Sequence, residues 1–352
     1  MTRLTVLALV AVAALGAWIA VGITAADAGD PTKPWHTADG FQNLPGAFNR
    51  DVPWTAYLRF SMARFGADEV PVLPPGHVLP EPQALADLAA MNGADSLTWL
   101  GHATFLIRLD GVTILTDPFL TDRASPFDFG GPTRYAPPGI TIENLPPIDV
   151  IVLSHSHYDS LDIPTLEAMA NKQDIQAVVP LGLGDIFRDL GFGVVHELDW
   201  FEAAEVDGLE ITALPSQHWS RRTLFDQNKT LWMGAAIQST ELSLYFSGDS
   251  GYGPNFADLG GQFGPFDFGI IGIGAYAPRE MMKATHTNPE EAVALAVDMA
   301  VRTVVGMHWG TIALGTEAPF EAPDRFLKAA QTLGFSPENA WILAIGESRR
   351  IR

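Results

Sequence analysis

A buried strand followed at once by metal-binding side chains organises this sequence. The apolar run Asp149–Leu153 has the length and β-branched content of a buried strand, and His155, His157 and Asp159 come directly after it. In an extended chain, a two-residue spacing points both imidazoles the same way. Two neutral imidazoles and a carboxylate suit a borderline metal such as zinc, and the chain has no cysteine to compete with them. This stretch predicts a metal site, provided that other parts of the chain place further ligands beside it.

Three later apolar runs end in the same way. Each is followed within a few residues by an imidazole or a carboxylate, namely His218, Asp249 and His308. Taken singly, a histidine after a strand is usually structural, and an aspartate after glycine usually belongs to a turn. Four such arrivals in a chain with 9 histidines, each in a loop that contains Gly or Ser, are difficult to explain by chance. We therefore predict that these side chains meet around a common ion.

The composition excludes several classes of protein. With 352 residues, 47% of them hydrophobic, the chain can bury a large core. The balance of 21 basic against 41 acidic residues gives a net charge of −20, which argues against nucleic acid as a partner because its phosphates would be repelled. The absence of cysteine excludes disulfides and thiolate ligands. A two-fold homodimer is the default expectation for an oligomer.

The first 30 residues have the pattern of an export segment. Arg3 precedes an apolar run over residues 4–26, and Ala26-Asp27-Ala28 is a small-x-small cleavage site. The run is also long enough for the ~20 residues that span a bilayer, so an uncleaved membrane anchor is an alternative to a signal peptide, and an internal hydrophobic helix is a third reading. In the first two cases we expect an exported, periplasmic or extracytoplasmic protein, anchored to the membrane where the segment is retained.

Residues 31–94 form a Pro-rich extension. Prolines at positions 71, 74, 75, 80 and 82 argue against any long helix or central strand there. Within the extension, one helical stripe is apolar: Trp54, Tyr57, Leu58, Met62 and Phe65. We expect this stripe to pack on the main domain, and the alternatives are that it lies in a membrane interface or covers a groove.

Residues 95–352 predict a mixed α/β domain. Apolar runs between turn signals predict strands, one pair of them joined by the hairpin turn Asp110-Gly111, at Ser96–Leu100, Ala103–Leu109, Val112–Thr116, Asp149–Leu153, Ala177–Pro180, Val194–Leu198, Leu209–Leu214, Leu231–Gln238, Leu242–Ser247, Asp267–Gly272, Val304–Met307 and Trp341–Ala344. Helical patterns lie at 163–171, Gly184–Leu190, 289–301 and Phe320–Leu333. Strands followed by mixed helices and strands, twice over, indicate two packed sheets with helices outside.

The motifs together resemble the metallo-β-lactamase fold superfamily. More particularly, they resemble the N-acylphosphatidylethanolamine-hydrolysing phospholipase D family and its bacterial relatives. The matching stretches are Trp99-Leu100-Gly101-His102-Ala103-Thr104, Leu115-Thr116-Asp117-Pro118, His155–Asp162, Ser247-Gly248-Asp249-Ser250-Gly251, His286-Thr287-Asn288-Pro289-Glu290-Glu291-Ala292 and Met307-His308-Trp309-Gly310. The resemblance extends from about Phe41 to the C-terminus and implies a four-layer αββα sandwich of two mixed β-sheets with helices outside.

The resemblance also implies a role for each candidate site residue. His155, His157 and His218 would hold a first metal, Asp159 and His308 a second, and Asp249 would bridge the two. Asp159 or Asp249 would hold the attacking water and accept its proton. His286 would stand beside the substrate, or else be a capping loop residue. His102 and Asp117 would lie beneath the site and orient its loops and ligands.

One position departs from the family pattern. The family has a second-metal histidine directly after the aspartate, where this chain has Ser160. A serine hydroxyl is a poor zinc ligand, so we expect one tightly bound Zn²⁺ and a second, weaker ion, with Mn²⁺ as an alternative metal.

These features leave three functions open. The first is a metal-dependent hydrolase that uses a metal-activated water to cleave an ester, most specifically the phosphodiester of an N-acyl phosphatidylethanolamine, in association with a membrane. The second is a lactonase or phosphodiesterase of a small soluble substrate, which a buried Trp54–Phe65 stripe would favour. The third is a degenerate, non-catalytic binding protein, which the loss of a ligand at Ser160 permits.

Overall fold

The computed structural model describes residues 30–48, 52–64, 70–127 and 130–352. The expected export segment lies, but for its last residue, outside the described residues. Among the helices that are described, none is long and apolar enough to cross a membrane.

The first large sheet has seven strands in the order β16-β3-β4-β5-β6-β7-β8. Its strands are β3 (Ser96–Gly101), β4 (Thr104–Leu109), β5 (Val112–Thr116), β6 (Val150–Val152), β7 (Gln176–Pro180), β8 (Val194–Leu198) and β16 (Ser348–Arg350). The pairs from β16 to β5 are antiparallel, and those from β5 to β8 are parallel. The sheet is therefore mixed, with a parallel half that contains the strand before His155.

The second large sheet repeats this arrangement with seven strands in the order β15-β14-β13-β12-β11-β10-β9. Its strands are β9 (Ala203–Val206), β10 (Leu209–Leu214), β11 (Gly234–Gln238), β12 (Ser243–Phe246), β13 (Phe266–Gly272), β14 (Val301–Met307) and β15 (Ala340–Trp341). Pairs from β9 to β12 are antiparallel, and pairs from β12 to β15 are parallel. A small two-stranded sheet, β1 (His36–Thr37) with β2 (Gly40–Phe41), precedes both.

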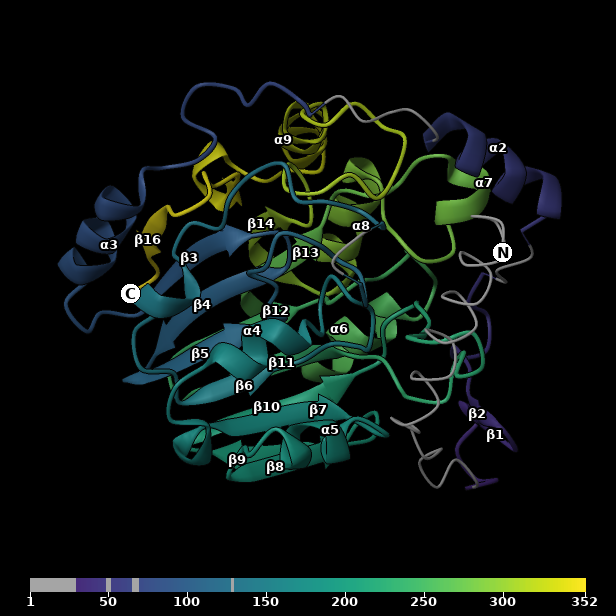
Figure 1. Ribbon diagram of the computed structural model, residues 1–352, viewed down its shortest axis with the longest axis horizontal. Helices are drawn as coiled ribbons and strands as arrows, with labels where there is room; N and C mark the ends of the chain where they lie inside the picture. The colour runs from purple at the N-terminus through teal and green to yellow at the C-terminus, as the bar shows by residue number, and fades with distance from the viewer. Residues whose placement is uncertain (1–29, 49–51, 65–69, 128–129) are drawn as a thin grey trace, which may run out of the picture.

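Helices cover the outer faces of the two sheets, which gives the expected four-layer αββα sandwich (Figure 1). The helices of the first side are α3 (Glu81–Ala90), α4 (Ile163–Ala168) and α5 (Gly184–Asp189), and those of the second are α6 (Phe256–Phe263), α8 (Pro289–Asp298) and α9 (Ala322–Thr332). Two further helices, α2 (Trp54–Arg64) and α7 (Arg279–Met282), contact each other. Short 3-10 turns lie at Ile142–Asn144, Lys172–Asp174 and Pro337–Asn339.

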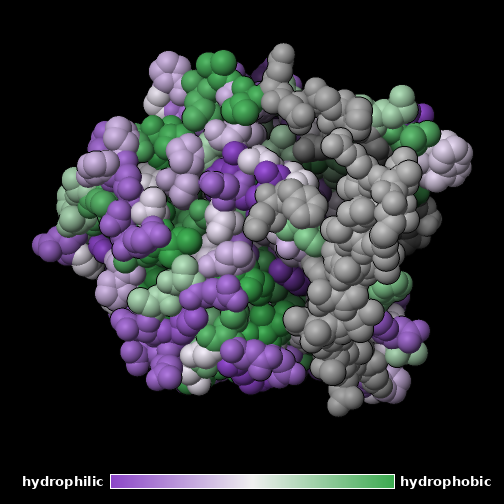
Figure 2. All heavy atoms as spheres, viewed as in Figure 1, coloured by the Kyte–Doolittle hydropathy of each residue, from purple (hydrophilic) through white to green (hydrophobic). Residues whose placement is uncertain are grey.

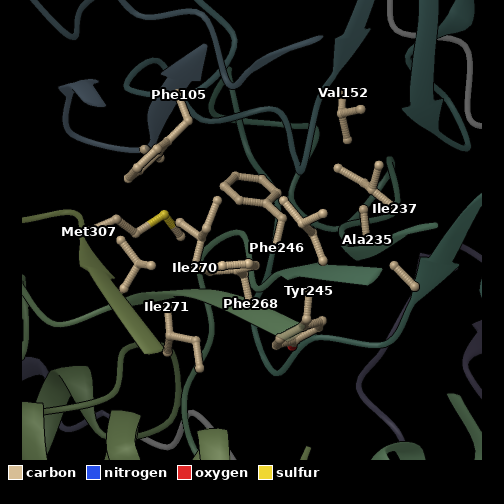
Figure 3. Close-up of a cluster of buried hydrophobic side chains, with 14 of the residues drawn as sticks. Phe105, Val152, Ala235, Ile237, Tyr245, Phe246, Phe268, Ile270, Ile271 and Met307 are labelled. Atoms are coloured by element: carbon tan, nitrogen blue, oxygen red, sulfur yellow. The ribbon is translucent and has the colours of Figure 1, made fainter. Parts of the chain in front are cut away.

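The main core lies between the two sheets. Along β4, Phe105 and Ile107 face the second sheet, whereas Leu106 between them packs under the outer helices, because side chains alternate along a strand. Figure 3 shows Phe105, Phe246 and Ile270 pointing into the same space. Apolar residues on both faces of a sheet are typical of one that is covered on both sides.

One contact of the N-terminal extension with the main domain is made to a buried carboxylate. Asp199 accepts hydrogen bonds from Lys33 Nζ at 2.7 Å and from Trp35 Nε1 at 2.7 Å, and its Oδ2 atom lies 2.8 Å from His36 Nε2. Farther along, Ala84 of α3 is fully buried.

The apolar stripe does not pack on the domain as we expected, as far as its side chains are described; Phe65 lies outside the described residues. Trp54 is 73% exposed, Leu58 50% and Met62 67%.

The face shown in Figure 2 is hydrophilic along its lower edge, where β8, β9 and α5 lie, and carries hydrophobic patches above it.

Several expected elements differ in extent. The helix after Asp162 ends at Ala168, before residue 171, and the last strand of the second sheet ends at Trp341. The Pro-rich extension contains a ten-residue helix, α3, since Pro82 stands in its first turn, where proline is tolerated. The start of α8 is as predicted, because Asn288 and Glu291 form a reciprocal capping box with Pro289 in the first turn.

Candidate metal centre

The candidate residues lie in loops that follow strands of both sheets. His102 follows β3 and Asp117 follows β5, both in the first sheet. His155, His157 and Asp159 lie in the loop after β6 of the same sheet. From the second sheet, His218, Asp249 and His308 follow β10, β12 and β14. The predicted convergence of His155, His157, His218 and Asp249 is present, with one ligand atom of each within 4.8 Å of the others.

The first cluster has the dimensions of a tetrahedral metal site. His157 Nδ1 lies 2.8 Å from His155 Nε2 and 3.2 Å from His218 Nε2. Asp249 Oδ2 lies 3.6 Å from His155 Nε2 and 3.8 Å from His218 Nε2. Ligands bound at 2.0–2.1 Å to a tetrahedral zinc lie about 3.3 Å apart, so the four atoms surround a space of the right size.

The hydrogen bonds behind these rings fix which nitrogen faces the centre. His218 Nδ1 lies 2.9 Å from the carbonyl of Thr285, which can only accept, so Nδ1 carries the proton and Nε2 presents a lone pair. His155 Nδ1 lies 2.8 Å from Ser154 Oγ, whose own proton goes to Asp117. Burial lowers the pKa of both imidazoles, which favours the neutral form that binds metals. Lone pairs directed at one another need a cation between them, so these residues fit a metal.

A second cluster lies on the other side of Asp249. Asp249 Oδ1 lies 3.0 Å from His308 Nε2, and Asp159 Oδ2 lies 3.5 Å from the same nitrogen. His102 Nε2 approaches Asp159 Oδ2 to 2.9 Å. The two oxygens of Asp249 thus face two different clusters, which is the geometry of a bridging carboxylate.

The charges of the second cluster also favour a cation. Burial opposes ionisation of Asp159 and Asp249, yet the neighbouring imidazoles hold the pKa of both carboxyls well below the ordinary value. Against the effect of burial, Asp249 raises the pKa of His308 to about 10. Two buried carboxylates therefore hold a positive charge between them, and a divalent ion can replace that proton.

His286 stands at the margin of both clusters. Its ring centroid lies 5.1 Å from that of His218 and 5.3 Å from that of His308, and it is only half-buried. Burial lowers its pKa to about 4, which keeps the imidazole neutral. Arg279 donates a 2.9 Å hydrogen bond to the His286 carbonyl and so fixes this loop. The side chain is placed to meet a molecule that approaches the centre.

One cleft has His308 in its lining, together with Tyr135, Ala275, Leu314 and Ala318.

Two residues expected beneath the site differ in position. The carboxylate of Asp117 contacts Ser154, behind His155, as an orienting residue would. His102 instead contacts Asp159 itself and belongs to a possible ligand group with Asp159 and His308. A signal for this was present in the sequence, because His102 also follows an apolar strand after a glycine.

Comparison with known sequences identifies the type of domain. A family described as "Beta-lactamase superfamily domain" matches residues 112–309. The chain is 43% identical over 242 residues to N-acyl-phosphatidylethanolamine-hydrolyzing phospholipase D 1 of Caenorhabditis elegans, a match that covers 66% of this chain and 68% of the relative.

Solved structures share the fold. Igni18, a metallo hydrolase from Ignicoccus hospitalis, matches 74% of this chain and 99% of its own with a TM-score of 0.54 at 22% identity. CmlA, a diiron β-hydroxylase from Streptomyces venezuelae, matches 76% of this chain and 59% of its own with a TM-score of 0.56 at 25% identity. The likeness to Igni18 concerns the fold alone.

Proposed function

This chain belongs to the metallo-β-lactamase superfamily and is a metal-binding hydrolase of that fold, and on this premise we propose that it cleaves the phosphodiester bond of an N-acyl phosphatidylethanolamine. Water would attack the phosphorus, and the bond to the N-acylethanolamine oxygen would break, leaving phosphatidic acid. The observation that carries this proposal is the set of two adjoining ligand clusters joined by Asp249, in a chain 43% identical to a phospholipase named for this reaction.

The proposed metal is Zn²⁺, with His155, His157 and His218 at the first position, Asp159 and His308 at the second, and Asp249 between them. When bound, a divalent ion supplies a water whose pKa is lowered towards ~7 and positive charge for the phosphoryl oxygens.

The protein's own groups then handle the proton and the substrate. Asp159 and Asp249 are buried in the two clusters, where one of these carboxylates would hold the attacking water and accept its proton. His286 borders both clusters and can hydrogen-bond a substrate oxygen. Neither step requires a serine nucleophile.

Two exposed apolar features support a lipid substrate. One is the exposed stripe of Trp54, Leu58 and Met62 on α2. Helix α2 contacts α7, which ends four residues before His286. The other is the loop tip Leu224-Phe225, 73% and 83% exposed, in the loop that begins after His218. Such side chains can enter the interface of a bilayer, and the net charge of −20 would favour a surface of low negative charge. The buried stripe that would have favoured a small soluble substrate is not present.

The first experiment separates an enzyme from a binding protein. Metal-loaded protein should hydrolyse bis(p-nitrophenyl) phosphate with added zinc or manganese, and the variant His155→Ala should lose at least about a hundredfold of that rate, because it removes a ligand. Turnover that survives both chelation and His155→Ala would contradict the proposal, as would its absence from the metal-loaded protein.

A second comparison identifies the substrate class. N-acyl phosphatidylethanolamine in phosphatidylcholine vesicles and a panel of soluble lactones would be assayed with the same preparation. We expect release of N-acylethanolamine from the vesicles and little lactone hydrolysis. Faster turnover of lactones than of the lipid would favour the small-substrate alternative.

A further inference from the structure

We infer that His102 is a ligand of the second metal and supplies the imidazole that Ser160 does not. The inference rests on the proposed metal centre but not on the proposed substrate, so it holds whichever ester is hydrolysed. On this side His308 shares one possible ligand group with His102 and Asp159, and another with Asp249 and His286. We assign the fourth ligand position to His102, because its Nε2 atom lies 2.9 Å from Asp159 Oδ2, whereas His286 stands half-buried at the margin.

The position of the His102 ring is that of a ligand. Its Nε2 atom lies 2.9 Å from Asp159 Oδ2, and one ligand atom each of His102, Asp159 and His308 lies within 4.8 Å of the others. The side chain is 1% exposed, and Nδ1 has no hydrogen-bond partner among the described residues. Its ring centroid lies 3.9 Å from that of His308, so both imidazoles reach the same space.

The backbone holds this ring in place at a cost. His102 and His308 both have positive φ angles, 56° and 61°, which residues other than glycine rarely adopt. His308 N–H donates to the His102 carbonyl at 2.9 Å, and His102 N–H donates to Thr311 Oγ1 at 2.9 Å. These bonds join the end of β3 in one sheet to the end of β14 in the other. Strained backbone of this kind is usually retained where it places a functional side chain.

Ser160 cannot fill the same role. Its side chain is fully buried, and its hydroxyl has no hydrogen-bond partner among the described residues. The alternative for His102 is that it only donates a hydrogen bond to Asp159 and so orients a ligand. The two roles differ in one respect, which is whether an imidazole nitrogen is bonded to the ion.

The test compares His102→Gln with His77→Gln. Glutamine at 102 can still donate an N–H to Asp159 but removes the imidazole. His77 is a second buried histidine, which contacts the Gly310 carbonyl and lies outside both clusters. Metal-free protein would be titrated with Zn²⁺ by calorimetry, and metal per chain measured after dialysis.

We expect His102→Gln to keep the first ion and to bind the second more than about a hundredfold more weakly, beyond the 10–100-fold typical of losing an orienting partner. His77→Gln should still bind two ions. Adding Ser160→His to His102→Gln should restore the second ion. A second ion bound within about a hundredfold of wild-type affinity in His102→Gln would overturn the inference, because a loss of that size is typical of an orienting partner.

A second measurement uses the unmutated chain, so its result does not depend on whether the variant folds. In Co²⁺-loaded protein, each coordinated imidazole gives a hyperfine-shifted N–H proton resonance. His102 as a ligand predicts five such signals, from His102, His155, His157, His218 and His308. Four signals from protein that contains two ions per chain would refute the assignment, whatever the substrate proves to be.

Discussion

At the scale of single residues, Asp117 sets the orientation of the first metal ligand. Its Oδ1 accepts the Ser154 N–H at 2.7 Å, and its Oδ2 accepts the Ser154 hydroxyl at 2.5 Å. Ser154 Oγ in turn lies 2.8 Å from His155 Nδ1. Because the serine proton is directed to Asp117, the serine oxygen is free to accept from His155, which turns the Nε2 lone pair towards the ion.

Replacing Asp117 with asparagine should weaken the first ion without removing a ligand. The amide has only one oxygen, so it cannot accept both hydrogen bonds from Ser154. We expect about 10–100-fold weaker zinc binding, in line with the loss of an orienting partner. Competition with a chromophoric chelator would measure this. Asp149→Asn is the matched control, because Asp149 also accepts a backbone N–H, from Thr113, but does so at the start of β6. Equal zinc affinity in Asp117→Asn and wild type would show that the hydrogen bonds from Asp117 through Ser154 do not orient His155.

The sequence indicated the ligands better than their roles. His155, His218 and His308 could be predicted because each follows an apolar strand in a short loop. The position of His102 depends on a φ angle of 56° and on hydrogen bonds to residues more than two hundred positions away, His308 and Thr311. The apolar strand and glycine before His102 mark it as a candidate ligand, but this local pattern does not specify those long-range contacts, so the pairing of His102 with Asp159 could not be predicted.

At the scale of elements, strands with an apolar pattern were predictable, including the edge strand β8, whereas the edge strands β9 and β16 were not. β4 and β14 lie close to where their sequences place them. β16, Ser-Arg-Arg, has no apolar residue and is a strand because it pairs with β3. β9 likewise forms the edge of the second sheet. The conformation of an edge strand depends on its partner more than on its own side chains.

Helix α2 provides a test of lipid association. Trp54→Gln, Leu58→Gln and Met62→Gln combined remove the exposed apolar stripe while keeping residues that tolerate a helix. Because each apolar side chain buried in an interface contributes up to about 1.5–3 kcal/mol, we expect at least about tenfold weaker binding to phosphatidylcholine vesicles. Hydrolysis of soluble bis(p-nitrophenyl) phosphate should not change.

The matched control for this variant uses Leu327 on α9 and Leu333 directly after it, which are 42% and 48% exposed. Leu327→Gln with Leu333→Gln should leave vesicle binding as in wild type, measured by co-sedimentation. If both variants bind vesicles equally, the α2 stripe has no special role and the lipid proposal loses one of its supports.

At the scale of the whole molecule, the two sheets meet at the metal centre. The first sheet supplies the loop with His155 and Asp159, and the second supplies His218, Asp249 and His308. Because the ligands belong to both halves of the sandwich, bound metal should stabilise the entire fold. The two-sheet architecture was predictable from the order of elements, whereas strand order within each sheet depends on pairings that no single segment encodes.

The same buried histidines make the metal-free protein sensitive to acid. Burial lowers the pKa of six imidazoles below 6.5, those of His77, His102, His155, His157, His218 and His286. Below about pH 6.5 the unfolded chain therefore binds more protons at these groups than the folded chain does. The free energy of unfolding consequently decreases as the pH falls. Burial raises the pKa of Asp117 and Asp162, which act in the opposite direction. His308, whose pKa is raised to about 10, acts in the same direction as these two, because its imidazole is already protonated in the folded chain when the unfolded chain takes up that proton near pH 6.5. Three groups therefore oppose six.

We therefore expect the free energy of unfolding of chelated protein to fall by on the order of a few kcal/mol between about pH 7 and about pH 5. Urea unfolding at several pH values would measure it. His77→Gln removes one of the six groups without contacting a ligand, and it should flatten the slope by up to about 1.4 kcal/mol per pH unit. Unfolding free energy that is constant, or that rises, as the pH falls would show that these imidazoles are not buried in the neutral form from which the metal centre is built.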